Sequence, residues 1–118
     1  MDYKIAVASS DGITVNQHFG RSEQFLIYEV NDEEWTYTQV EIRPNKAACQ
    51  MGEHDNHALF LSAYNLRDCK YVIVSRVGPG ARNALKDQGV EVYELPGIIE
   101  DSIEQMLNYL ELQAFIFD

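Results

Sequence analysis

The chain has few cysteines, few basic residues and no long apolar run, and each shortage argues against a class of protein. Only two of the 118 residues are cysteines, Cys49 and Cys69, so we expect reduced thiols in the cytoplasm, with a single disulfide as the alternative. Nine Lys and Arg residues stand against 19 Asp and Glu residues, and the net charge of −10 argues against nucleic acid and anionic membranes as partners. No apolar segment approaches the ~20 residues of a membrane span, and residues 1–4 lack the character of a signal peptide.

The local motifs of familiar enzymes are also missing. The sequence holds no G-x-S-x-G, H-E-x-x-H or Walker A pattern. The turn at residues 78–80 is not a dinucleotide-binding fingerprint, because Asn83 stands where the third glycine would be. We therefore expect a protein that is not an enzyme.

The hydrophobic pattern predicts a single α/β domain over residues 1–118. A hydrophobic share of 46% with 24% charged residues is ordinary for a globular chain. The expected strands are short apolar or β-branched runs at residues 4–8, 25–30, 35–42, 71–74 and 90–93. Helices are expected from Asp55, near Ala81 and from Ile99. This order predicts three layers, with a five-stranded mixed sheet and helices on its faces.

The first candidate for chemistry is His18, in the polar loop over residues 16–21. The residue lies among turn-forming neighbours, so we expect an accessible imidazole. A neutral imidazole can bind iron, copper or zinc, and a protonated one can donate to an anion. The alternative is a loop histidine that hydrogen-bonds a neighbouring carbonyl group.

The second candidate is the segment 49–57, which places one thiol and two imidazoles within nine residues, just before a helix. Cys49, His54 and His57 together suit soft or borderline metals and iron–sulfur species. Their spacing does not match a structural zinc site, which needs four ligands in paired short spacings. Cys69 stands beside the most apolar strand and is expected to be a small buried hydrophobic residue.

A third candidate is the glycine-rich turn at residues 78–80, which precedes a short helix. Arg76 and Arg82 flank this turn. It either cradles an anion with its backbone N–H groups or serves only as a turn.

Five segments of the chain form a recognisable pattern. The most specific is V-N-Q-H-F-G at residues 15–20, and the others are residues 5–12, 25–30, 49–55 and 74–81. Together they resemble the dinitrogenase iron–molybdenum cofactor biosynthesis family, which includes NifX-like carriers and the C-terminal domain of NifB-like proteins. The resemblance covers about residues 4–110.

The resemblance implies a ribonuclease-H-like three-layer fold, in agreement with the predicted order of elements. It also implies binding or carrying of the iron–molybdenum cofactor, or of an iron–sulfur cluster precursor, during maturation of nitrogenase or a related metallocluster enzyme. His18 and Cys49 occupy the family's histidine and cysteine positions, and His54 and His57 would add imidazole ligands. Arg21 and Arg76 would supply positive charge to an anionic cluster. Nitrogenase maturation proteins would be the partners.

Two other functions compete with this one. The acidic surface and the apolar tail at residues 114–117 suit a metal-independent protein-interaction or regulatory module of the same fold. The tail would then join two protomers as a homodimer, unless it packs back onto the domain. A ribonuclease-H-like nuclease would need several carboxylates converging on magnesium, and Asp11 alone stands at the end of the first strand.

Overall fold

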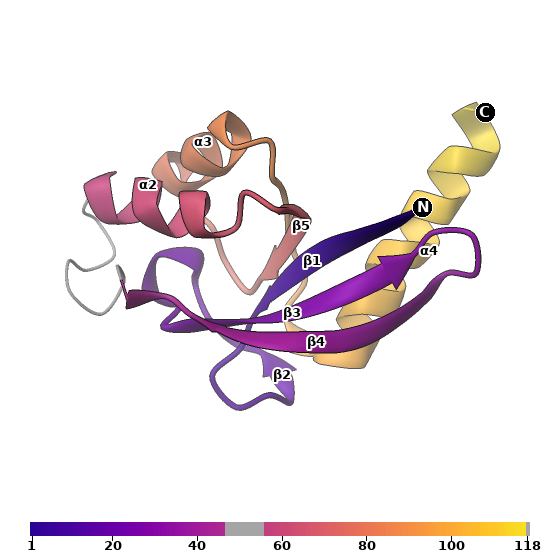
Figure 1. The fold of residues 1–118 in the computed structure, drawn as a ribbon, viewed down its shortest axis with the longest axis horizontal. Helices are drawn as coiled ribbons and strands as arrows, with labels where there is room; N and C mark the ends of the chain where they lie inside the picture. The colour runs from indigo at the N-terminus through magenta and orange to yellow at the C-terminus, as the bar shows by residue number, and fades with distance from the viewer. Residues whose placement is uncertain (47–55, 118) are drawn as a thin grey trace.

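A computed structural model describes residues 1–46 and 56–117 and has a five-stranded mixed sheet at its centre (Figure 1). The sheet order is β4-β3-β1-β5-β6. Strand β1 pairs antiparallel with β3 and parallel with β5, β3 pairs antiparallel with β4, and β5 pairs parallel with β6. The strands are β1 (Asp2–Ala8), β3 (Gln24–Asn31), β4 (Thr36–Pro44), β5 (Cys69–Val74) and β6 (Glu91–Glu94).

Helices cover both faces of this sheet, so the domain has three layers (Figure 1). Helices α2 (Asn56–Asn65) and α3 (Pro79–Asp87) pack on one face, over a core that includes Ala6, Phe25 and Val72. Helix α4 (Ile99–Phe117) packs on the other face, over Val7 and Ile73. The central strands are apolar at consecutive positions because both of their faces are buried.

The predicted five-stranded mixed sheet with its helices is confirmed, with additions at the ends of elements. A two-stranded ladder joins β2 (Thr14–Val15) to β7 (Gly97–Ile98), and a short 3-10 turn, η1 (Phe19–Arg21), follows β2. These elements of two or three residues are too short to show a periodic pattern of hydrophobic residues in the sequence. The predicted helix start at Asp55 lies outside the described residues.

The apolar tail does not pack back onto the domain. Helix α4 continues to Phe117, and its last turns carry Phe115 and Phe117 at 85% and 79% exposure. In the described part of the chain, no helix has both the length and the apolar character needed to cross a membrane.

Candidate functional site

Two loops that are far apart in sequence meet at one edge of the sheet. The loop after β1 and the loop after β5 leave parallel neighbours, so both start at the same edge. The Ser75 N–H donates to the Gln17 carbonyl at 3.0 Å, and the Phe19 N–H donates to the Arg76 carbonyl at 3.0 Å. A parallel bridge thereby pairs His18 with Arg76. Two of the predicted site residues are neighbours in space.

The buried residues Phe19 and Ser22 fix the backbone position of His18. The Phe19 ring is fully buried and lies 5.8 Å, centroid to centroid, from the ring of Phe25. The Ser22 hydroxyl, also buried, donates to the His18 carbonyl at 3.0 Å. These contacts hold the backbone of His18 while its side chain remains half-buried at the edge of the sheet.

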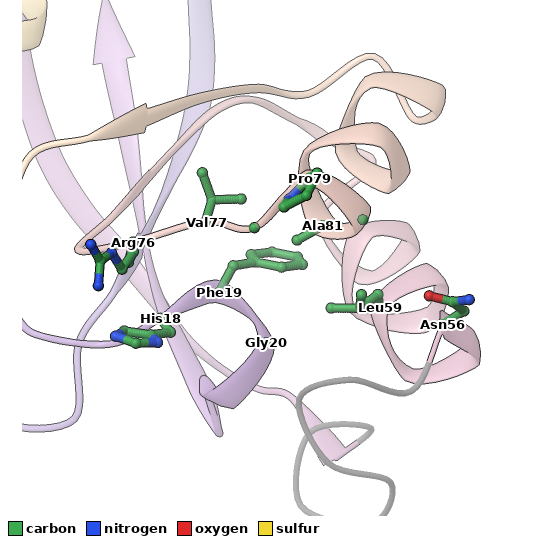
Figure 2. A pocket seen from close by; sticks show the side chains of 11 residues that line it. His18, Phe19, Gly20, Asn56, Leu59, Arg76, Val77, Pro79 and Ala81 are labelled. Carbon is green, nitrogen blue, oxygen red and sulfur yellow. The ribbon is translucent and has the colours of Figure 1, made fainter.

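A cavity of about 500 Å³ opens between this loop and the first turns of α2 and α3 (Figure 2). His18 and Arg76 lie together on one side of it, and the Phe19 ring reaches toward Leu59 (Figure 2). The volume lies within the range of about 300–1,000 Å³ that is usual for ligand pockets.

The first turn of α3 forms another wall of the cavity. Pro79 begins the helix and no acidic residue stands in that turn, so its N–H groups and the helix dipole favour an anion. A Cβ atom on Gly80 would lie 3.4 Å from the Leu59 side chain, an ordinary van der Waals distance, so α2 and α3 are in contact at this turn.

The arginines near the cavity differ in their surroundings. Arg76 lines it, is exposed, and has no ion-pair partner within the described residues. Arg82 instead forms an ion pair with Glu94 at 3.5 Å, and the same carboxylate accepts the Val77 N–H at 3.0 Å. Arg21 follows the cavity residue Gly20 in sequence and is exposed. Arg76 is therefore the cation best placed to meet an anionic ligand.

The remaining predicted ligands are not brought to this cavity by the part of the chain that is described. Cys49 and His54 lie outside the described residues. His57 is exposed in the first turn of α2 and does not line the cavity. Within residues 1–46 and 56–117, no three histidine, cysteine or acidic side chains gather in a way that could hold a metal ion.

Two further residues have structural roles. Cys69 is buried, as predicted, and burial together with the adjacent Asp68 raises the pKa of its thiol to about 12. The Asp11 carboxylate accepts the Thr14 and Ile13 N–H groups at 2.8 Å each, and these bonds lower its pKa well below the usual range. The Asp11 carboxylate thus stabilises the turn that follows β1.

The cavity also contains residues that the sequence did not single out as functional. Asn56 and Leu59 come from the start of α2, and Phe19 comes from η1. For Phe19, the sequence offers one signal of a role in the site, its position directly after His18. Asn56 and Leu59 have no such signal, because the contacts that bring them to the cavity join residues far apart in the sequence.

The comparisons with known proteins agree with this fold. The family model described as dinitrogenase iron-molybdenum cofactor matches residues 1–109. FeMo cofactor biosynthesis protein NifB of Chlorobaculum tepidum is 34% identical over 99 residues, which are 84% of this chain and 22% of that protein. NifB of Frankia alni is 31% identical over 105 residues, which are 86% of this chain and 20% of that protein. The chain thus spans about a fifth of the length of these curated relatives.

Two solved structures are similar in fold. The crystal structure of PH0822 has a TM-score of 0.68 at 22% identity, covering 89% of this chain and 90% of that chain. The NMR structure of TM1290 from Thermotoga has a TM-score of 0.55 at 23% identity, covering 88% of this chain and 86% of that chain. From the family match over residues 1–109, the chain belongs to the dinitrogenase iron–molybdenum cofactor family.

Proposed function

We propose that this protein binds and carries the iron–molybdenum cofactor, or an iron–sulfur precursor of it, during maturation of nitrogenase or a related enzyme. It does so without catalysing a reaction. The observation that supports this most is the cavity of about 500 Å³ in which His18 and an arginine without an ion-pair partner in the described residues lie side by side. Family membership supports the choice of cargo.

The chemistry of the cavity suits such a cargo. A metallocluster brings its own sulfide ligands, so a carrier needs to supply few ligands of its own. The imidazole of His18 is a suitable ligand for iron. The guanidinium of Arg76 and the N-terminus of α3 would stabilise the negative charge of the cluster.

Cys49 remains a predicted second ligand, and His54 and His57 remain predicted additional ones. This part of the proposal rests on the resemblance of residues 49–55 to the family and on the affinity of thiolate and imidazole for iron.

We also propose that the domain is of the ribonuclease-H-like class, and the order of its sheet supports this. Three strands, β4, β3 and β1, form an antiparallel unit, and β5 and β6 continue it in parallel. The shortage of cysteines supports a cytoplasmic site of action.

An anaerobic titration with isolated cofactor or precursor tests the carrier function. We expect the His18→Ala, Cys49→Ala double variant to bind the cluster at least about tenfold more weakly than the wild type, a loss of about 1.4 kcal/mol. His57→Ala removes one of the predicted additional ligands and leaves the lining of the cavity unchanged, because His57 does not line the cavity. Its affinity therefore measures the contribution of that ligand separately from the contribution of His18. Equal binding by the wild-type protein and the double variant would refute the proposal.

A metal-independent interaction module is the second candidate, because the last turns of α4 expose a group of apolar side chains. Size-exclusion and pull-down measurements separate the two functions. A stable partner complex that is indifferent to metal and to Cys49→Ala would favour the module.

A further inference from the structure

A second hollow, of about 420 Å³, lies at the end of the sheet opposite the cavity. Strand β4 runs in the same direction as β1, so its first residues lie at the edge away from the ends of β1 and β5. The turn that joins β3 to β4 lies beside α4 there (Figure 1). Trp35 and Tyr37 form one wall, and Glu104, Leu107 and Glu111 form the other. We call this hollow the hairpin groove.

Trp35 is held in the groove by an unusual backbone conformation. Its φ angle is +57°, the one positive value for a non-glycine residue within the described part of the chain. Bulky side chains rarely adopt this left-handed conformation. The indole is half-buried against the core beneath α4 and also lines the groove. The groove therefore has an aromatic wall that packs in part against the core.

The opposite wall carries negative charge that no described cation neutralises. Glu104 accepts the Tyr37 hydroxyl at 3.1 Å. Neither Glu104 nor Glu111 has an ion-pair partner among residues 1–46 and 56–117. Helix α4 contains no lysine or arginine, and the N-terminal amine is paired with Asp32 at 2.6 Å.

Aromatic faces and carboxylates together recognise a cation, and arginine above all. A guanidinium group stacks on an aromatic ring and donates paired hydrogen bonds to carboxylates. The planar, weakly hydrated guanidinium suits a half-buried site better than an ammonium group does.

The surface next to the groove indicates that the cation belongs to a protein. Glu104, Asn108, Glu111 and Phe115 follow one another at intervals of four, three and four residues, which places them along one face of α4. Phe115 is 85% exposed and Leu112 is 56% exposed. A charged groove that continues into an exposed apolar strip resembles a protein interface, with an anchoring pocket and an apolar flank.

We propose that the hairpin groove receives an arginine side chain of a partner protein, whose neighbouring apolar residues pack on Leu112 and Phe115. The net charge of −10 and the carboxylates of Glu104 and Glu111, which form no ion pair with the described residues, complement a basic partner segment. This interaction goes beyond cargo binding and uses the opposite end of the sheet, so both sites can be occupied together.

The single tryptophan of the chain makes the groove directly observable. Trp35 is the only Trp, so selectively excited tryptophan fluorescence reports on this site alone. The probe is a peptide with arginine at every fourth position among alanine and leucine residues. Its control replaces each arginine with citrulline, which keeps the shape and removes the charge. Acetyl-arginine amide tests whether a small cation suffices.

Two double variants with the same change in charge locate the binding. Glu104→Gln with Glu111→Gln removes the groove carboxylates, and glutamine can still accept the Tyr37 hydroxyl. Asp87→Asn with Glu91→Gln removes two exposed charges on α3 and β6. We expect the groove variant to bind the arginine peptide at least about tenfold more weakly, and the control variant to stay within about twofold of the wild type.

Several results would overturn the proposal. Equal losses in the two double variants would indicate nonspecific attraction, and equal binding of the citrulline peptide would exclude a cation. Acetyl-arginine amide binding as tightly as the peptide would indicate a small-molecule site. Concentration-dependent dimers that Phe115→Ala abolishes would assign the surface to a second copy of the chain. Cluster binding at His18 is unaffected by any of these outcomes, so this proposal and the carrier function fail separately.

Discussion

At the scale of single residues, the ion pairing of an arginine determines how strongly its charge can attract a ligand. Arg76 lines the cavity and has no ion-pair partner among the described residues, whereas Arg82 pairs with Glu94 at 3.5 Å. Both arginines flank the same turn and contribute the same formal charge. Of these two charges, that of Arg76 lines the cavity and is not engaged in an ion pair within the described residues, so it is the better placed to attract an anionic cluster.

Replacing each arginine in turn tests this difference. We expect Arg76→Gln to weaken cluster binding by about tenfold and to reduce the dependence of that binding on salt concentration. Arg82→Gln should leave the affinity within about twofold of the wild type, because Glu94 already neutralises that side chain. Anaerobic titration at low and high salt measures both. Equal losses in the two variants would mean that net charge, and not the position of Arg76, attracts the cluster.

Individual residues of the two sites differ in how far their roles can be predicted from the local sequence. His18 and Arg76 are predictable from the sequence because His18 lies among turn-forming residues in a polar loop and Arg76 flanks a glycine-rich turn. Phe19 and Trp35 read as ordinary apolar residues in the sequence. Their roles depend on contacts with Phe25 and α4, and for Trp35 on a φ angle that no propensity for tryptophan predicts.

At the scale of elements, one arginine ties the edge strand β4 to the rest of the domain. The guanidinium of Arg43 donates to both carboxylate oxygens of Asp68, at 2.7 and 2.9 Å. It also donates to the Asn65 carbonyl at the end of α2 and to the carboxylate of Glu41. The side chain of Arg43 is only 13% exposed, so this cluster links β4, α2 and the start of β5 through a largely buried cation.

This cluster predicts a specific loss of stability in acid. The hydrogen bonds from Arg43 lower the pKa of Asp68 to about 2, below its value in the unfolded chain. The stabilisation is therefore fully present above about pH 4 and is lost as the pH falls toward 2. Asp68→Asn should lower the free energy of unfolding by about 1 kcal/mol at neutral pH, because solvent screens a carboxylate that is 42% exposed.

Urea denaturation at several pH values measures the effect. The Asp68→Asn variant should lose less stability than the wild type between pH 4 and 2, whereas Asp87→Asn, at the exposed end of α3, should follow the wild type. An Asp68→Asn variant as acid-sensitive as the wild type would show that the Arg43 cluster does not stabilise the fold.

The elements themselves were predictable to different degrees. Strands β1 and β5 stand out because consecutive apolar residues are needed where both sheet faces are covered. The pairing of Thr14–Val15 with Gly97–Ile98 has no local signal, since two residues show no period. The sequence left open whether the apolar tail at residues 114–117 packs back onto the domain, and the structure shows that the tail continues helix α4 with exposed apolar side chains.

At the scale of the whole molecule, the two ends of the sheet differ in chemistry. The cavity end presents an imidazole, an arginine and a helix N-terminus, and the groove end presents two aromatic rings and two carboxylates that form no ion pair within the described part of the chain. A net charge of −10 does not reveal this division, because it averages over the surface. The separation suits a carrier that would hold an anionic cargo at one end and dock a basic partner at the other.

The most direct test is to ask whether the His18 nitrogen binds the cluster. Pulsed electron paramagnetic resonance of the paramagnetic, cluster-loaded protein, prepared with isotope-labelled histidine, reports nitrogen coupled to iron. The carrier function predicts that one histidine coupling of the wild type is lost in His18→Ala and retained in His57→Ala, because His18 lines the cavity and His57 does not. Couplings from the predicted additional ligands His54 and His57 would be separate signals that His18→Ala leaves in place. A spectrum unchanged by His18→Ala would contradict the carrier function.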